Sequence, residues 1–350
     1  AGQGAGITDS DFTQAGAAVV SDPAVIFRQA DIVLKVQIPA KRPDGLDEMT
    51  LLRQGLVLVG MLEPLTRPDR LAALAGTGAA CFAMEAVPRI SRAQSMDALS
   101  SMSTVAGYKA VLLAADRLKK MMPMMMTAAG TVHPAGAMII GAGVAGLQAI
   151  ATARRLGANV KAVDTRPAVK EQVESLGARF VHLEVAGHKA EATSGYARDL
   201  GEEFYRDEQE TIAPHLKDCD IAITTALVPG RRAPILLTET MVQTMPPGAV
   251  IVDMAVAAGG NCVLSKADQA VEAHGVTILA PTNLPALVPV HASQLYARNL
   301  AAFIRELVKD GKVNIDMSNE VIRSMLVANE GKVLFAPVHE AQAKKDGSLS

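Results

Sequence analysis

Three spaced glycines stand between a short apolar run and an apolar helical pattern: Gly141, Gly143 and Gly146. In this spacing the first glycine allows a tight turn, the second lets the backbone approach a pyrophosphate, and the third lets a helix pack closely on a strand. The free N–H groups of the helix start, at Val144, can then hold phosphate oxygens. The pattern predicts a dinucleotide-binding loop.

An acidic residue stands where this motif requires one. Asp164 follows a second strand, 160–163, and lies 18 residues after Gly146, where a carboxylate accepts both ribose hydroxyls of an adenosine. Because the same charge repels a 2′-phosphate, the sequence predicts NAD(H) rather than NADP(H), with Thr165 in the same turn. Arg166 could favour NADP(H), but we expect an exposed turn arginine or a neighbour of the pyrophosphate.

A membrane span is the main alternative for this part of the chain. Residues 121–153 contain no charged side chain unless His133 is protonated. However, Pro123, Pro134 and five glycines interrupt any continuous helix, and a span needs about 20 unbroken apolar residues. We therefore expect no direct membrane insertion.

Composition indicates a soluble, cytosolic α/β protein. The chain has 350 residues, is 49% hydrophobic and carries a formal charge of −2, so it can bury a large core and has no basic surplus for nucleic acid. Cys81, Cys219 and Cys262 are isolated in the sequence, which argues for reduced thiols and against a disulfide or zinc framework.

Strands and helices alternate in two series, which predicts two Rossmann-like domains with parallel sheets and a cleft between them. A helix over 95–122 connects them. We place the first domain at 1–99 plus 287–350, the connecting helix at 100–122 and the nucleotide-binding domain at 123–286. The elements expected are strands at 31–36, 56–59, 79–84, 179–181, 221–224, 249–253 and 276–279, and helices at 48–53, 67–74, 197–210 and 293–310.

Five segments together resemble one family. The chain is similar to the NAD(H)-binding component, domain I of the alpha subunit, of proton-translocating NAD(P) transhydrogenase, in the alanine dehydrogenase/transhydrogenase superfamily. The likeness covers nearly the whole chain in unbroken order and is more specific than the glycine motif. The segments that carry it are 89–97 (RISRAQSMD), 123–131 (PMMMTAAGT), 141–149 (GAGVAGLQA), 170–177 (KEQVESLG) and 253–262 (DMAVAAGGNC).

The resemblance implies a function. Such a chain binds NAD(H), forms a homodimer, and docks on an NADP(H)-binding component carried by a membrane-spanning partner subunit. Hydride passes directly between the two nicotinamides, while protons cross the membrane through other domains. The chain would then be cytoplasmic and peripheral on the inner membrane through its partner.

Polar residues at 89–100 match the family's nicotinamide loop. Arg89, Gln94 and Asp97 supply donors and acceptors that suit a carboxamide, its ribose and a phosphate. The family match adds neighbours in the same loop, namely Ile90, Ser91, Arg92 and Ser100. A plain helix start is the alternative, because Ser91 to Gln94 fits a capping box and Asp97 suits a first turn.

Alanine dehydrogenase is the nearest cousin with a different reaction. Its substrate lysine resembles Lys35, but the position of its acid–base histidine is occupied here by Met61-Leu62, beside Glu63. Direct hydride transfer moves no proton at the reacting carbons and needs no such group. We therefore expect Lys35 to be a structural or surface lysine.

Three further segments carry expectations. Gly195 and Tyr196 match a mobile lid of the family, with a surface loop as the alternative. Residues 224–227, including Thr225, Ala226 and Leu227, end a strand at the presumed cofactor edge, or simply terminate it. The methionines at 121, 122 and 124–126 are expected to be adaptable core packing at a domain hinge.

The chain begins at Ala1-Gly-Gln-Gly, so the first domain is expected to lack the family's usual N-terminal strand and to expose a sheet edge. This keeps a non-catalytic NAD-binding paralogue, or an alanine dehydrogenase-like oxidoreductase, as alternatives to the transhydrogenase component.

Overall fold

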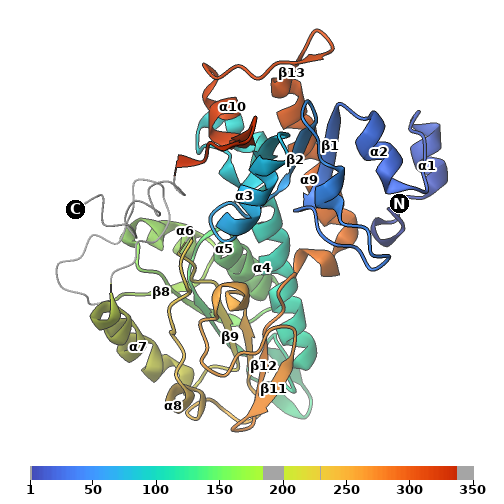
Figure 1. The fold of residues 1–350 in the computed structure, drawn as a ribbon. Coiled ribbons are helices and arrows are strands. Elements are labelled where there is room, and N and C mark those ends of the chain that lie inside the picture. Colours follow the sequence, from blue (N-terminus) through green and yellow to red (C-terminus); the bar gives the residue numbers. More distant parts are fainter. Residues whose placement is uncertain (1, 184–200, 229, 337–350) are drawn as a thin grey trace. The chain divides into compact units, whose positions relative to one another are not determined.

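The computed structural model describes residues 2–183, 201–228 and 230–336. The chain divides into two compact units, Ala1–Ser101 with Pro289–Ser350, and Met102–Val288 (Figure 1). Each unit is built on a sheet with a parallel centre, which confirms the predicted α/β class. We call them unit 1 and unit 2.

Unit 2 contains a seven-stranded sheet in the order β11-β12-β10-β9-β6-β7-β8. All pairs are parallel except β11 with β12. The chain order reverses between β6 and β9, and ligands of such sheets bind at the carboxyl ends of the strands at that switch point. The strands are β6 (Gly136–Ile140), β7 (Asn159–Val163), β8 (Arg179–Val181), β9 (Ile221–Thr224), β10 (Val250–Asp253), β11 (Ala270–Ala273) and β12 (Val276–Leu279).

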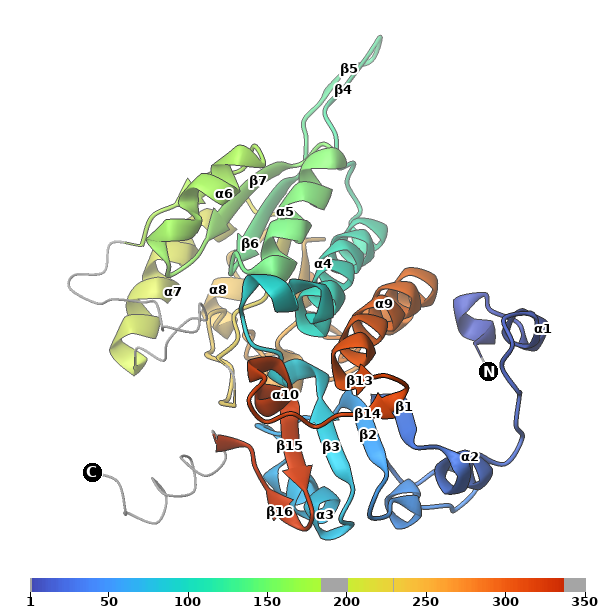
Figure 2. The same cartoon turned by 90° about the horizontal axis from the view of Figure 1, so that it is seen from above.

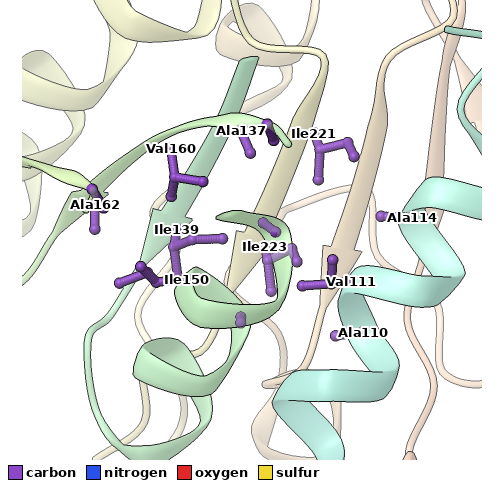
Figure 3. Packing of buried hydrophobic residues seen from close by; sticks show 14 of the residues in the cluster. Ala110, Val111, Ala114, Ala137, Ile139, Ile150, Val160, Ala162, Ile221 and Ile223 are labelled. Atoms are coloured by element: carbon purple, nitrogen blue, oxygen red, sulfur yellow. The ribbon is translucent and has the colours of Figure 1, made fainter. Parts of the chain in front are cut away.

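Apolar residues cover both faces of this sheet, because strands buried on two sides read as continuous apolar runs. One face packs on α4 (Ala98–Arg117), α5 (Val144–Arg155) and α6 (Lys170–Ser175), where Val111, Ile139 and Ile150 meet (Figure 3). The other face packs on α7 (Glu202–Leu216) and α8 (Glu239–Val242).

Helix α4 approaches α5 at backbone distance. A Cβ atom on Gly107 would lie 2.1 Å from the carbonyl oxygen of Ala145, so only glycine fits there. By length and hydropathy α4 could cross a membrane, and it is the one such helix among the described residues. Its residues Ala106, Ala110 and Ala114 are nevertheless buried in the core of unit 2, as in the core helix of a globular domain.

Unit 1 contains a five-stranded sheet in the order β1-β2-β3-β15-β16. Its first three strands are parallel and the last two pair antiparallel. Helix α9 (Pro289–Leu307) packs Phe303 against Phe82 of β3, with ring centroids 5.3 Å apart. The other elements of the sheet and its cover are β1 (Ile32–Gln37), β2 (Val57–Met61), β3 (Ala80–Ala83), β15 (Leu326–Asn329), β16 (Lys332–Val333), α2 (Pro23–Gln29), α3 (Pro68–Gly76) and α10 (Glu320–Met325).

Several helix boundaries differ from the sequence-based expectation. The helix expected at 48–53 is a short 3-10 turn, Glu48–Leu51, started by Asp47, whose carboxylate accepts from the Met49 N–H. The connecting helix begins at Ala98, because Asp97 caps it, and ends at Arg117. The sequence analysis did not anticipate α1 (Asp9–Gln14) or the short pair β13 (Val308–Lys309) and β14 (Lys312–Val313).

The methionine-rich segment is not core packing, and that expectation was wrong. It forms a hairpin of β4 (Met125–Thr127) and β5 (Gly130–Val132), which projects from the rest of unit 2 (Figure 2). Met124 is 60% exposed and Met126 78%, whereas Met122 is buried. A two-stranded ribbon without a third strand has no face against which to bury its side chains.

The three cysteines are unpaired and buried. Burial raises the pKa of the Cys81 and Cys219 thiols to about 12 and also raises the pKa of Cys262. These thiols therefore stay protonated and unreactive near neutral pH.

We predict that Gly107→Ala destabilises unit 2, because the added methyl group must push α4 away from Ala145. The expected loss in free energy of unfolding is about 1–3 kcal/mol, measured by urea denaturation. The matched control is Gly76→Ala in α3, where a Cβ atom meets nothing within 4 Å. Helix propensity should make this control neutral or up to about 1 kcal/mol more stable. Equal stabilities of the two variants would contradict the close approach.

Candidate dinucleotide-binding site

The glycine loop joins β6 to α5 under tight steric limits. Gly141 adopts φ +94°, and a Cβ atom there would lie 2.6 Å from Thr225 Oγ1. A Cβ atom on Gly146 would lie 1.9 Å from the carbonyl oxygen of Gly141. The first and third glycines therefore hold strand, loop and helix at backbone distance, as the sequence motif predicted.

The second glycine leaves open space. Gly143 is the N-cap of α5 and makes no side-chain cap, and a Cβ atom on it would meet nothing within 4 Å. The first N–H groups of a helix have no acceptor within it and carry the positive end of the helix dipole. Val144, the first helical residue, is 42% exposed. These features fit a dinucleotide pyrophosphate, for which the loop supplies donors and room.

Asp164 lies at the carboxyl end of β7, next to this loop. Its Oδ2 accepts the Ala142 N–H at 2.7 Å, which joins the carboxylate to the loop between the first two glycines. Its Oδ1 accepts the Arg166 N–H at 2.8 Å. The side chain is only 6% exposed, so its charge acts in a poorly solvated setting.

Arg166 is not the exposed turn arginine that the sequence suggested. Its side chain is 14% exposed and grips Asp164 with both forks, Nε to Oδ1 and Nη2 to Oδ2, each at 2.9 Å. A carboxylate has about four lone-pair sites, and Ala142 and Arg166 together fill four. Ribose hydroxyls can therefore bind Asp164 only by displacing part of the Arg166 contact.

A second carboxyl group, which the sequence analysis missed, lies close to Asp164. Glu208 of α7 is 3% exposed, and its pKa is raised to about 8, first by burial and then by the negative charge of Asp164. A signal was present in the sequence: Phe204, Glu208 and Ile212 are four residues apart, so the carboxyl group occupies the buried stripe of the helix.

Residues after β9 complete this edge of the sheet. The Thr225 hydroxyl donates to the Gly141 carbonyl at 3.0 Å, and the Ala226 N–H donates to Asn261 Oδ1 at 3.1 Å. Leu227 is 45% exposed. Thr225 thus supports the glycine loop, while Leu227 offers an apolar surface at the carboxyl end of the strand.

Asp253 holds the loop that carries Asn261. It is fully buried and accepts from three backbone N–H groups, those of Ala255, Asn261 and Cys262. The hydroxyls of Thr224 and Ser265 also donate to it. Because a Cβ atom on Gly260 would lie 2.8 Å from this carboxylate, the segment 253–262 requires glycine there. Its role is to position the turn at Ala226.

The expected nicotinamide loop lies in unit 1. Residues Ser91–Met96 form a 3-10 helix that buries Ala93 and Met96 and exposes Ser91 and Gln94. Arg89 is also exposed, and Ile90 is half-buried. Asn299 of α9 anchors the loop by donating to the Ser95 carbonyl at 2.8 Å. The loop therefore presents polar side chains from a fixed backbone.

Asp97 and Arg92 make contacts within unit 1. Asp97 accepts from the Ser100 N–H at 2.8 Å and from the Ser100 hydroxyl at 2.6 Å, so it starts α4, as the helix-start alternative proposed. Arg92 pairs with Glu306 at 2.9 Å and donates to Asn319. Arg92 anchors the loop to α9 in this state, which leaves Arg89 and Gln94 as its exposed polar groups beside Ser91.

The positions that would serve an amino-acid dehydrogenase are occupied otherwise. Lys35 pairs with Glu48 at 2.6 Å with both side chains largely buried, which confirms it as a structural lysine. Glu63 adopts φ +53°, its N–H donates to Glu85, and its own half-exposed carboxylate pairs with Arg67 at 3.5 Å. Neither group is free to exchange protons with a substrate. Gly195 and Tyr196, the expected lid residues, lie outside the described residues.

Comparisons with known proteins agree with this architecture. The family model described as alanine dehydrogenase/PNT, N-terminal domain, matches residues 1–106, and the C-terminal domain model of the same family matches residues 110–336. The chain therefore belongs to the alanine dehydrogenase/PNT family.

Within this family the chain is more similar to transhydrogenases. The first portion of the NAD(P) transhydrogenase alpha subunit of Rhodospirillum rubrum, a separate chain, is 49% identical over 95% of this chain and 88% of its own length. A transhydrogenase structure from Sinorhizobium meliloti superposes with a TM-score of 0.83 at 42% identity, over 95% of this chain and 89% of the other. Alanine dehydrogenase of Bacillus subtilis is 28% identical over 97% of this chain and 84% of its own length.

We predict that stability falls with rising pH through Glu208. The folded state holds the proton up to about pH 8, whereas the unfolded chain releases it near the ordinary 4.5, so protonation favours folding. Between these values the free energy of unfolding should drop by up to about 1.4 kcal/mol per pH unit. Glu208→Gln, which stays neutral, should become more stable than the parent chain as pH rises toward 9.

The measurement is urea denaturation at pH 5, 7 and 9, with Glu210→Gln on the exposed face of α7 as the control. A stability difference between Glu208→Gln and the parent chain that does not grow with pH would contradict the neutral buried carboxyl group.

Proposed function

We propose that this chain is the NAD(H)-binding component of a proton-translocating NAD(P) transhydrogenase. It passes hydride directly between NADH on its own site and NADP⁺ on a partner component. The observation that carries this proposal is the glycine loop joined to the Asp164 carboxylate through the Ala142 N–H. That arrangement suits an adenosine ribose without a 2′-phosphate.

Direct transfer requires little of the side chains. Hydride moves from one nicotinamide carbon to another, so no alkoxide forms and no proton is exchanged at the reacting atoms. The nucleotide supplies the hydride chemistry, and the chain holds the dinucleotide in position. The ion pairs of Lys35 with Glu48 and of Glu63 with Arg67 are compatible with this reaction, since each keeps an ionisable group occupied.

In this proposal the two ends of the dinucleotide are recognised differently. The α5 N-terminus, with Gly143 and Val144, binds the pyrophosphate, and Asp164 with the Thr165-Arg166 turn binds the adenosine ribose. Arg89 and Gln94 orient the nicotinamide carboxamide, because their exposed side chains combine planar donors with an amide acceptor. Asp97 and Ser100 hold the start of α4, so that the loop keeps its shape.

The assembly belongs to the same proposal. The R. rubrum relative is named as one portion of an alpha subunit, which fits a chain that works with further transhydrogenase subunits. We place this chain on the cytoplasmic side of the inner membrane, held there by its membrane-spanning partner. The exposed methionines of the β4–β5 hairpin offer an apolar contact for a second copy in a homodimer. Analytical ultracentrifugation tests the dimer, and a monomer at micromolar concentration would contradict it.

For nucleotide choice, we predict that Asp164→Ala weakens NADH binding about 10- to 150-fold, because charge-assisted hydrogen bonds worth about 1.5–3 kcal/mol are lost. NADPH should lose less or gain, because Arg166 is then released and can meet a 2′-phosphate. Calorimetric titration with both nucleotides measures this, with Glu171→Gln on exposed α6 as the control. Equal affinity of the unsubstituted chain for NADH and NADPH would contradict the assignment.

For the nicotinamide loop, we predict that Gln94→Ala slows hydride transfer in the presence of the NADP(H)-binding partner about tenfold more than it weakens NADH binding. A residue that orients the ring affects the transition state more than the ground state. Stopped-flow single-turnover rates and NADH titrations on the same variant separate the two effects. If rate and affinity fall by the same factor, Gln94 is instead a general nucleotide contact.

A further inference from the structure

A second polar cavity lies at the amino ends of the central strands of unit 2, at the opposite edge of the sheet from the glycine loop. It has a volume of about 450 Å³, within the range of small-molecule sites. Its lining includes five basic side chains from different segments, namely Lys120, Arg154, Lys161, Arg179 and His215. Nothing in the proposed hydride transfer uses this cavity.

Two of these cations are direct neighbours in the sheet. Lys161 of β7 and Arg179 of β8 are register partners in a parallel pair, so their side chains leave the same face of the sheet. Neighbouring strands lie about 4.8 Å apart, and like charges placed opposite one another are destabilising. The folded protein therefore keeps two positive charges together at this edge against their mutual repulsion.

His215 shares the surroundings of these two charges. It lies in the last turn of α7, which covers one face of the sheet through Ile212 and Leu216. The pKa of His215 is lowered, first by burial and then by the positive charges of Lys161 and Arg179. The three groups therefore act on one another in one electrostatic environment.

The cluster is not neutralised by the protein. Within residues 2–183, 201–228 and 230–336, the side chains of Lys161, Arg179 and His215 make no hydrogen bond or ion pair. Of the two acidic residues in the lining, Asp220 binds Lys120 at 2.8 Å, and exposed Asp218 does not pair with the cluster. A positive surplus therefore remains in the cavity.

We propose that this cavity binds a small phosphate-type dianion, either free phosphate or a phosphate monoester, between Lys161, Arg179 and His215. Planar guanidinium and ammonium groups in one concave site are the usual partners of phosphate oxygens. The dianion relieves the repulsion within the cluster and gives each cation an acceptor.

This site is separate from the dinucleotide site. Glu208, close to Asp164, and His215 are seven residues apart on α7, which is about 10 Å along the helix axis. The strands place the glycine loop at their carboxyl ends and the cavity at their amino ends. Phosphate binding here can therefore succeed or fail independently of the proposed NAD(H) binding.

The test follows the imidazole of His215 by NMR as pH is varied, without and with inorganic phosphate, and a His215→Gln variant assigns the signal. Saturable binding of phosphate should raise the pKa of His215, because the dianion stabilises the imidazolium. Arg179→Gln, at an exposed position, and Lys161→Met should each weaken phosphate binding about tenfold, as for the loss of one charge-assisted contact. Glycerol 3-phosphate in place of inorganic phosphate distinguishes a monoester from free phosphate.

The matched control is Lys217→Gln, which removes an exposed charge just beyond α7 and outside the cavity and should leave phosphate binding unchanged. NADH affinity, measured on each variant, reports that the domain is folded. The proposal is overturned if phosphate does not shift the titration, if sodium chloride of equal ionic strength shifts it as much, or if Arg179→Gln and Lys161→Met bind phosphate as the parent chain does.

Discussion

The close backbone packing around the glycine loop is the constraint on which the nucleotide site depends. The Gly141 carbonyl accepts the Thr225 hydroxyl and leaves no room for a Cβ atom on Gly146, while Gly107 brings α4 against the first turn of α5. Helix α5 is therefore fixed against β6, β9 and α4 at backbone distance. Its N-terminus, the element that suits a pyrophosphate, is set by packing and not by a side-chain cap.

A group of charges at the end of β7 then determines which nucleotide this rigid loop suits. Asp164 is tied to the loop through Ala142 and covered by Arg166, while Glu208 stays neutral behind it. A ribose with two free hydroxyls can replace arginine contacts with its own donors, whereas a 2′-phosphate brings only further negative charge to two carboxyl groups. The arginine keeps a buried carboxylate paired until a ribose takes its place.

Local sequence spacing predicted the elements closest to the site. The glycine spacing, the strands around it and Asp164 follow from contacts over about twenty residues, where period and steric rules are strong. The Arg166 fork did not follow, because a sequence does not specify side-chain direction in a turn. The exposed methionines were missed because hydrophobicity alone does not reveal whether a ribbon has a partner surface. The Asp253 network joins segments far apart in the chain, so spacing gave no hint of its geometry.

Comparison of two reactions tests the central claim most directly. The purified chain would be mixed with an NADP(H)-binding transhydrogenase component, and the transfer of hydride from NADH to bound NADP⁺ would be followed by absorbance or by deuterium label. The same chain alone would be assayed for NAD⁺ reduction with alanine. We expect direct transfer of the label only when the partner is present, and no reaction with alanine. Alanine-dependent reduction by the isolated chain, without label transfer to the partner nucleotide, would contradict the account.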